Sequence, residues 1–324
     1  MIIARSPLRI TLGGGGTDLP TYYERKGGAL LSAAIDRYVY VAVHPTFLPH
    51  WLIRYSQIET VEHPRDVKHP ILREALDLLQ VSPRPLEITT MADIPAGTGL
   101  GSSGSFGTAL LKALLRHQRK VVQPAELAAM AAHIEIDRLK EPVGKQDQYI
   151  AAFGGVTWFE FHPDGRVDAS PAALPDDTLR QLEERLLLFS TGIRRSASAI
   201  LDEQDKKTKQ GDTDMIANLD KVKQIGLDSR QALERGDLGA FGEMLHHHWQ
   251  EKKKRSGQMT NPEIDHWYDE ARRAGALGGK LIGAGGGGFL MFLAEDPSPL
   301  RAAMQKLGLD ELRFRFDYEG TRLL

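Results

Sequence analysis

The sequence contains no cysteine, which excludes disulfide bonds, thiolate metal sites and a cysteine nucleophile. Its 324 residues carry a formal net charge of only −2, so the overall charge gives no indication of nucleic-acid binding. Apolar runs long enough to cross a bilayer are lacking, and Met1–Arg5 does not form a basic region followed by an apolar core. We therefore expect a cytoplasmic enzyme without a nucleic-acid or membrane partner.

Several familiar catalytic motifs are also missing. No Gly-Lys-Ser/Thr follows a glycine loop, which excludes a Walker A phosphate loop, and the His-Arg-Asp and Asp-Phe-Gly signatures of protein kinases are absent. The histidine cluster His246–His248 has no His-Glu-x-x-His pattern, and adjacent residues of a helix cannot converge on one metal ion. We expect these histidines on a solvated or interfacial helix, with Trp249 serving packing or a substrate-pocket wall.

Glycine is abundant at a position where a ligand could approach the backbone. The segment Pro95–Ser105 follows a strand expected over 86–91 and precedes an amphipathic helix expected over 103–117. Its glycines remove Cβ atoms at a sharp turn, and Ser102 and Ser103 place N–H and hydroxyl groups at the start of the helix. This arrangement suits a polyphosphate and a metal ion, because unpaired amides and the positive end of a helix dipole favour anions.

Two segments match the pattern Gly-x-Gly-x-x-Gly, namely Gly99–Gly104 and Gly283–Gly288. Each match alone is weak evidence for a dinucleotide site, and the first lacks the second parallel strand that ends in an acidic residue. An NAD-binding dehydrogenase therefore stays as a weak alternative, which ATP and NAD binding assays would separate from a kinase.

Two further glycine-rich segments, Arg5–Leu19 and Gly278–Leu290, stand near the ends of the chain. Together with Pro95–Ser105 they resemble, in order and spacing, the three motifs of the GHMP small-molecule kinases, and the resemblance spans nearly the whole chain. The segment Ser6–Asp18 is most similar to the branch of heptose-phosphate kinases and fucokinases. Two later segments are similar to that branch as well: Ser190–Ser196 and Ser256–Asp265.

The mixture of expected strands and helices indicates an α+β protein, with a helix-rich polar stretch from Ser196 to about Arg273. The resemblance implies two domains, a GHMP kinase N-terminal domain over 1–175 and a C-terminal domain over 176–324. It further implies that the first resembles the second domain of ribosomal protein S5 and that the second is ferredoxin-like. The active site is expected between them.

The resemblance also implies a nucleotide site in the central loop, with a magnesium site beside it. The residues expected to bind ATP are Pro95, Gly97, Gly99, Leu100, Gly101, Ser102, Ser103 and Gly104. Mg²⁺ prefers oxygen ligands, and the resemblance assigns them to the Ser103 hydroxyl and the Glu135 carboxylate. From the residues alone, Ser103 could simply cap its helix, and Glu135 could be an exposed residue of the helix expected over 124–140.

Asp147 matches the catalytic aspartate of the family, and Arg9 matches the arginine of the first motif that accompanies it. The resemblance implies that Asp147 accepts the proton of the acceptor hydroxyl, although some family members work without such a base. The permanent charge of Arg9 would keep Asp147 ionised and offset charge on the phosphoryl group. Without the resemblance, Asp147 could be a surface helix cap and Arg9 an exposed strand residue.

The substrate residues implied by the resemblance are Gly15, Gly16, Thr17, Asp18, Arg195, Gly285, Gly286 and Gly287. Asp18 matches an aspartate that holds sugar hydroxyls, although it could instead cap a helix that starts near Leu19. Galactokinases have Gly-Glu-His-Thr-Asp where this chain has Gly14–Asp18. The missing side chains at Gly15 and Gly16 therefore predict a wider pocket, for a bulkier or phosphorylated sugar.

Basic side chains could hold a remote phosphate of such a sugar, since arginine pairs with phosphate through two parallel hydrogen bonds. The candidates are Arg194, Arg195, Lys254 and Arg255. For Arg195, we expect a surface ion pair as much as phosphate binding. For Lys252 and Lys253, a solvated helix face is the favoured expectation.

The resemblance thus predicts an ATP-dependent sugar kinase that phosphorylates an anomeric hydroxyl and releases ADP, with a heptose 7-phosphate as the first expected substrate. The alternatives are a free-sugar 1-kinase of the fucose or galactose type, a mevalonate-type kinase, and a regulator that binds ATP and sugar without turnover. Intact Ser103, Glu135 and Asp147 favour an enzyme over a regulator. The sequence leaves a homodimer open.

Overall fold

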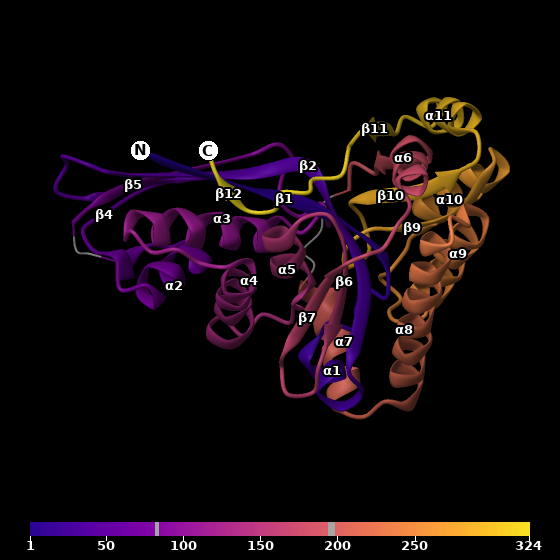
Figure 1. Cartoon of the computed structure of the whole chain (residues 1–324), viewed down its shortest axis with the longest axis horizontal. Helices are drawn as coiled ribbons and strands as arrows, with labels where there is room; N and C mark the ends of the chain where they lie inside the picture. Colours follow the sequence, from indigo (N-terminus) through magenta and orange to yellow (C-terminus); the bar gives the residue numbers. More distant parts are fainter. Residues whose placement is uncertain (82–83, 194–197) are drawn as a thin grey trace.

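The computed structural model describes residues 1–81, 84–193 and 198–324. Over these residues the chain forms an eight-stranded sheet and a four-stranded sheet, each with helices packed on it (Figure 1). The expected α+β class is confirmed. Within the same residues, no helix combines the length and the apolar character that crossing a membrane requires.

The helices and strands follow the chain in this order: β1 (Ile2–Gly13), α1 (Pro20–Lys26), β2 (Gly28–Pro45), β3 (Trp51–Arg54), β4 (Ile58–Val61), α2 (Pro70–Leu78), β5 (Leu86–Ala92), α3 (Ser102–His117), α4 (Pro124–Ala132), α5 (Gln146–Phe153), β6 (Val156–Phe161), β7 (Val167–Pro171), α6 (Asp176–Arg185), β8 (Leu186–Ser190), α7 (Ser198–Lys209), α8 (Thr213–Glu234), α9 (Leu238–Lys253), α10 (Pro262–Arg273), β9 (Ala276–Leu281), β10 (Phe289–Ala294), α11 (Pro297–Lys306), β11 (Asp310–Leu312) and β12 (Arg322–Leu323). A 3₁₀ turn at Pro64–Asp66 and a π-helical turn at His133–Arg138 are also present.

The larger sheet is organised around β1 and β2, which pair antiparallel. Its strand order is β12-β1-β2-β5-β3-β4, and β6 with β7 extends it from the first part of β2. The hydrophobic pattern predicts two strands, over 29–35 and 38–43, where the structure has the single strand β2. The register shift between Pro7 and Leu8 accommodates Asp36 and Arg37 as a bulge, so the strand continues instead of ending there.

Helices α2, α3, α4 and α5 lie on one face of the larger sheet (Figure 1). Most of α3 is buried, because it packs on β1 and β2 on one side and on α4 and α5 on the other. The helix expected over 124–140 changes at His133 into the π-helical turn, and Glu135 lies buried within this turn. Wider turns of this kind occur frequently at functional sites.

The smaller sheet has the strand order β11-β8-β10-β9, and its central strands are almost wholly apolar and buried. Helices α9 and α10 pack on β9, and α11 packs on α10. The long helices α8 and α9 lie side by side, and both also contact β1 of the larger sheet (Figure 1). This helix pair therefore connects the two sheets.

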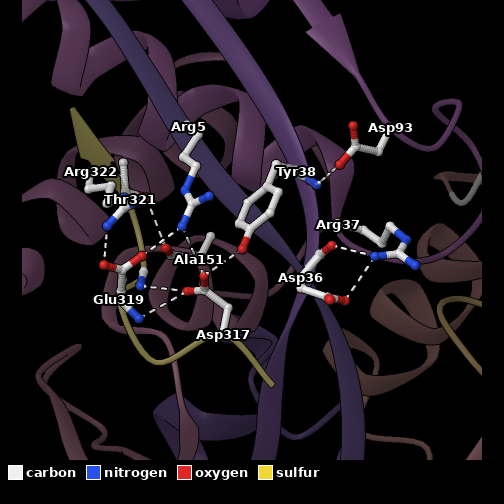
Figure 2. A network of polar contacts seen from close by, with 11 residues as sticks. Arg5, Asp36, Arg37, Tyr38, Asp93, Ala151, Asp317, Glu319, Thr321 and Arg322 are labelled. Carbon is white, nitrogen blue, oxygen red and sulfur yellow. Dashed lines mark hydrogen bonds and ion pairs between the residues drawn. The ribbon is translucent and has the colours of Figure 1, made fainter. Parts of the chain in front are cut away.

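The last residues of the chain leave the smaller sheet and return to the larger one. β12 pairs with β1 near its start, so the two termini lie close together (Figure 1). The buried Asp317 carboxylate is central to this contact, as Figure 2 shows. It accepts hydrogen bonds from the Tyr38 hydroxyl at 2.9 Å and from the Gly320 backbone N–H at 2.8 Å, and the Arg5 guanidinium lies 3.7 Å away. The C-terminal segment thereby fastens the two sheets together.

The division into 1–175 and 176–324 stays a prediction. The segment from Arg313 onward, which that division places in the second domain, lies against the larger sheet in the structure. Arg37 of β2 donates to the Arg313 carbonyl, and Phe316 forms a β-bridge with Ile35. The sequence pattern cannot show this return, because the segment contains no long strand or helix of its own.

Candidate active site

The three glycine-rich segments, far apart in the sequence, meet in the structure. The backbone N–H of Arg9 in β1 donates to the Leu100 carbonyl of the central loop at 3.0 Å. The loop after β9 approaches the central loop so closely that a Cβ at Gly283 would lie 2.5 Å from the Gly99 Cα. Only glycine permits this contact, because a side chain there would overlap the neighbouring backbone. Together the three segments line a cavity of about 320 Å³.

The central loop presents an anion-binding turn to this cavity. Gly97, Gly99 and Gly101 have left-handed φ angles of 79°, 81° and 80°, which residues with a Cβ rarely adopt. Gly101 occupies the N-cap of α3, and the helix begins at Ser102. The first amides of α3 and the positive end of its dipole are therefore directed at the cavity, where they favour a phosphate group.

The structure divides the residues expected to bind ATP into two groups. Five of them line the cavity: Gly97, Gly99, Gly101, Ser102 and Ser103. The other three do not line it: Pro95, Leu100 and Gly104. Of these, Leu100 is buried, and Gly104 packs on α5, where a Cβ would lie 2.8 Å from the Asp147 Cβ. Leu100 and Gly104 therefore shape the loop, while the five cavity-lining residues can reach a ligand.

Arg9 and Asp147 form a bidentate ion pair in the cavity. Nε and Nη2 of Arg9 donate to Oδ1 and Oδ2 of Asp147 at 2.7 and 2.9 Å, and Nη1 donates to the Gly99 carbonyl. Arg9 is only 7% exposed, whereas the Asp147 side chain is 27% exposed. Arg9 is therefore no exposed strand residue, and Asp147 keeps access to the cavity. These paired hydrogen bonds fix the orientation of the carboxylate.

Glu135 is buried next to Ser103 and Gln148. It is 3% exposed, accepts a hydrogen bond from Gln148 Nε2 at 2.7 Å and is hydrogen-bonded to Ser103. Burial raises the pKa of Glu135 to about 7, and the nearby carboxylates Asp147 and Glu141 act in the same direction. Among the described residues, no lysine or arginine forms an ion pair with it. Gln148 Oε1 is also buried and has no hydrogen-bond partner. A carboxylate without a cation beside an unpaired amide oxygen and a hydroxyl fits a hard cation such as Mg²⁺.

The described residues contain no group of three or more histidine, aspartate or glutamate side chains that could hold a metal ion by themselves. A magnesium ion at Ser103 and Glu135 would therefore take its other oxygens from nucleotide phosphates and water, as Mg²⁺ usually does. The residues present fit such a shared site.

Asp18 lines the cavity from the first glycine segment. It is 7% exposed, and its carboxylate accepts from the backbone N–H groups of Gly16 at 3.1 Å and Gln146 at 3.0 Å. Burial raises the pKa of Asp18, while these two hydrogen bonds favour its charged form. Helix α1 has Leu19 at its N-cap and no side-chain cap, so Asp18 is not the helix cap considered from the sequence. Its free lone pairs can accept sugar hydroxyls.

The other residues expected to bind substrate differ in position. Gly15 and Gly16 line the cavity, but the buried Thr17 instead donates to the carbonyl groups of Gly14 and Ala29 and holds the turn. The third motif reaches the cavity through Gly283 and Ala284. The predicted residues of that motif, Gly285, Gly286 and Gly287, pack against Met259 and Ile193. Arg195 and Arg194 lie outside the described residues.

Gly15 and Gly16 also do not leave the empty space that the sequence suggests. A Cβ at Gly15 would lie 2.9 Å from Thr11 Cγ2, and a Cβ at Gly16 would lie 2.5 Å from Arg255 Nη1. The volume above Gly16 is therefore filled by a guanidinium group. The glycines give access to a charged side chain more than they widen the pocket.

Sequence reasoning missed most of the basic wall of the cavity. Lys252, expected on a solvated helix face, is 7% exposed, and Lys280 and His248 are each 2% exposed. All three line the cavity, as does Arg255. A signal was present for Lys280, which is a lone charge in the apolar strand β9. For Lys252 the signal was its helical spacing of three from the buried Trp249.

Two family models match the chain. The model of the GHMP kinases N terminal domain matches residues 69–155, and the model GHMP kinases C terminal matches residues 229–310. The first match contains the central loop together with α3 and α5, and the second contains α9 and the third glycine motif.

The whole chain is also similar to individual proteins. The D-glycero-alpha-D-manno-heptose 7-phosphate kinase of Campylobacter jejuni subsp. jejuni serotype O:2 is 31% identical over 336 residues, covering 99% of this chain and 98% of that protein. The L-fucokinase/L-fucose-1-P guanylyltransferase of Bacteroides fragilis is 28% identical over 92% of this chain, which spans 35% of that longer protein. A crystal structure of a D-glycero-D-manno-heptose 1-phosphate kinase from Bacteriodes thetaiotaomicron matches with a TM-score of 0.81 and 27% identity, covering 100% of this chain and 99% of that one.

Proposed function

The chain belongs to the GHMP kinases and has their two-domain fold, and from this premise we propose that it phosphorylates the anomeric hydroxyl of D-glycero-D-manno-heptose 7-phosphate. The products would be the 1,7-bisphosphate and ADP. As a sugar kinase of this family, the enzyme transfers phosphate from ATP to a hydroxyl group. The observation that carries the proposal is the Arg9–Asp147 pair, which holds a carboxylate beside the anion-binding loop.

The geometry supports Asp147 as the base of this reaction. Its exposed edge can accept the proton of the anomeric hydroxyl while that oxygen attacks the γ-phosphorus of ATP. A new C1–O–P linkage forms, the bond from the γ-phosphorus to the bridging oxygen of ADP breaks, and ADP leaves with its electron pair. Arg9 orients the Asp147 carboxylate and places positive charge beside the developing negative charge. Asp18 would orient neighbouring sugar hydroxyls.

We also propose that Ser103 and Glu135 hold the magnesium ion of Mg-ATP. The ion would neutralise charge on the phosphate oxygens while the α3 amides bind the same group. The supporting features are the buried Glu135 carboxylate without a cation and its contact with the Ser103 hydroxyl.

Replacing Ser103 by alanine should raise the Mg²⁺ concentration needed for half-maximal ADP release, because one oxygen ligand is lost. The matched variant is Ser102→Ala, which removes the hydroxyl one residue earlier in the same turn and should shift that concentration less. Magnesium titrations at saturating ATP measure both, and thermal unfolding without ligand should change little in either. Equal Mg²⁺ dependence in Ser103→Ala and the parent would contradict the ligand role.

The identity of the sugar is tested by following ADP release with heptose 7-phosphate, free heptose, mannose, fucose, galactose and mevalonate. Similarity to the Campylobacter jejuni kinase over the whole chain supports the first of these, so we expect it to give the highest kcat/KM. The fucokinase match makes a fucose-type 1-kinase the second candidate. Preference for fucose or galactose would replace the heptose proposal, and ATP binding without turnover of any sugar would favour the regulator. The homodimer stays a prediction.

A further inference from the structure

The basic wall of the cavity contains three buried cations that the proposed transfer step does not use. We define the cationic cluster as Lys252, Arg255 and Lys280, which are 7%, 4% and 2% exposed. Lys252 lies in the last turn of α9, Arg255 follows it by three residues, and Lys280 lies in β9. All three line the cavity that also contains Asp18 and Asp147.

The hydrogen-bond partners of the cluster are neutral. Lys252 Nζ donates to the carbonyl groups of Leu281, at 2.9 Å, and Gly283. Lys280 Nζ donates to the Leu12 carbonyl at 3.2 Å and lies 3.0 Å from Nδ1 of His248. Within the described chain, neither ammonium group has a carboxylate at ion-pair distance.

Arg255 is also incompletely satisfied. Its Nε donates to Asn218 Oδ1 at 3.0 Å, and its Nη1 donates to the Gly15 carbonyl at 3.2 Å and to Gln204 Oε1 at 3.5 Å. Its Nη2 is buried with no hydrogen-bond partner. An unpaired nitrogen on a buried guanidinium is costly unless an anion binds it.

Asp18 and Glu251 favour the charged form of Arg255, but within the described chain no carboxylate forms an ion pair with any member of the cluster. Asp147 is already paired with Arg9, and Asp18 is held by two backbone N–H groups. Burial and the neighbouring cations lower the pKa of both Lys252 and Lys280. A doubly negative group bound among the three would restore their charge and remove most of the cost of burying them.

The position of the cationic cluster indicates which phosphate group would bind to it. Arg255 and Lys280 contact the first glycine motif, at Gly15 and Leu12, and Arg255 fills the space above Gly16. This motif also contains Asp18, which lines the expected sugar site. The nucleotide phosphates are expected at the central loop, where the α3 amides and Ser103 lie.

We propose that the cationic cluster is the subsite for a phosphate group carried by the sugar substrate, and that Arg255 and Lys280 make the enzyme select phosphorylated over unphosphorylated sugars. This inference rests on the proposed function, because it assigns the second end of the same substrate. Arg255 would donate to the phosphate through its unpaired Nη2, and the lysine ammonium groups would act as point charges. Binding at this remote group would also help to align the anomeric hydroxyl.

The test measures sugar binding by calorimetry on the full chain saturated with ADP, so that the central loop is occupied and no turnover is needed. The unmodified protein should bind heptose 7-phosphate about tenfold or more tightly than free heptose, as expected for hydrogen bonds to a charged group. Arg255→Gln and Lys280→Met should each remove most of this preference while changing the affinity for free heptose little. The control is Lys206→Met, because Lys206 is exposed, pairs with Asp202 and does not line the cavity, and it should keep the full preference.

A second measurement needs no variant and covers the case in which a variant does not fold. With ADP bound, inorganic phosphate should compete with heptose 7-phosphate but not with free heptose. The absence of this competition, or equal affinity for the two sugars, would overturn the inference. If both variants still prefer heptose 7-phosphate to free heptose but bind ADP more weakly, the cluster belongs to the nucleotide site, and the inference is overturned as well.

The kinase assay separates the inference from the proposed function. If the enzyme turns over heptose 7-phosphate, and Arg255→Gln and Lys280→Met still prefer this sugar to free heptose, the inference is wrong but the proposed function stands. Phosphate-dependent sugar binding that is lost in the two variants, without ADP release, supports the subsite and contradicts the kinase proposal for that sugar.

Discussion

Replacing Asp147 by asparagine should lower kcat by about 10²–10⁴-fold, the range typical of a lost general base. Asparagine keeps the shape of the side chain and can still accept a hydrogen bond from Arg9, but it carries no charge and cannot take the proton of the sugar hydroxyl. ATP affinity should change much less, because the α3 amides and the glycine loop remain. Steady-state ADP release and an ATP titration measure the two effects.

The matched control is Asp137→Asn. This residue belongs to the π-helical turn, has a 59% exposed side chain and pairs with His133 at the surface. Its replacement should leave kcat within about twofold, since exposed ion pairs contribute little. If Asp147→Asn also stayed within twofold of the parent, the general-base role would be wrong, although the kinase assignment would stand.

Replacing Gly104 by alanine should lower both the unfolding temperature and kcat. A Cβ at this position of α3 would lie 2.8 Å from the Asp147 Cβ and from the Gln148 backbone nitrogen. Because these atoms belong to α5, the helices must separate, and overpacking of this kind costs about 1–3 kcal/mol. Asp147 would shift with α5, and a displacement of about 1 Å at a reacting group can lower the rate about 10²-fold.

Gly107→Ala is the control, one turn further along α3. A Cβ there would lie 3.6 Å from the Ala131 Cβ, which is ordinary contact. Alanine is a better helix former than glycine by roughly 1 kcal/mol, so this variant should be as stable as the parent or slightly more stable, with unchanged kcat. Thermal unfolding and ADP release compare the pair. Equal behaviour of the two variants would show that the α3–α5 contact at Gly104 tolerates a methyl group.

Local sequence patterns predicted the features that a few neighbouring residues determine, namely the start of α3 and the α+β class. The glycines of the central loop and the apolar spacing after them placed the start of α3 within one residue, at Ser102 instead of Ser103. The α+β class also followed from strand and helix patterns. These features are local because a helix terminus, a left-handed glycine and an alternating strand are determined by a few adjacent residues.

Other features depended on the resemblance or on tertiary contacts. Residue types in the motifs suggested that Arg9 and Asp147 belong together, and the structure places them 2.7 Å apart although 138 positions separate them. The same motifs did not show that Thr17 turns its hydroxyl to backbone carbonyl groups or that Gly285, Gly286 and Gly287 do not line the cavity. The continuity of β2 depended on its pairing with β1 and was not visible in its own residues.

The sequence by itself determined the family and the conformation of the central glycine loop, because these are written as ordered motifs with local conformational demands, whereas the roles of its acidic residues stay predictions from the resemblance. Only the tertiary structure decided that Lys252, Arg255 and Lys280 are buried together at one cavity. A charged side chain is normally solvated, and its burial depends on which distant elements pack over it. Here α9, β9 and the first glycine motif do so, and their meeting turns three separate basic residues into one binding surface.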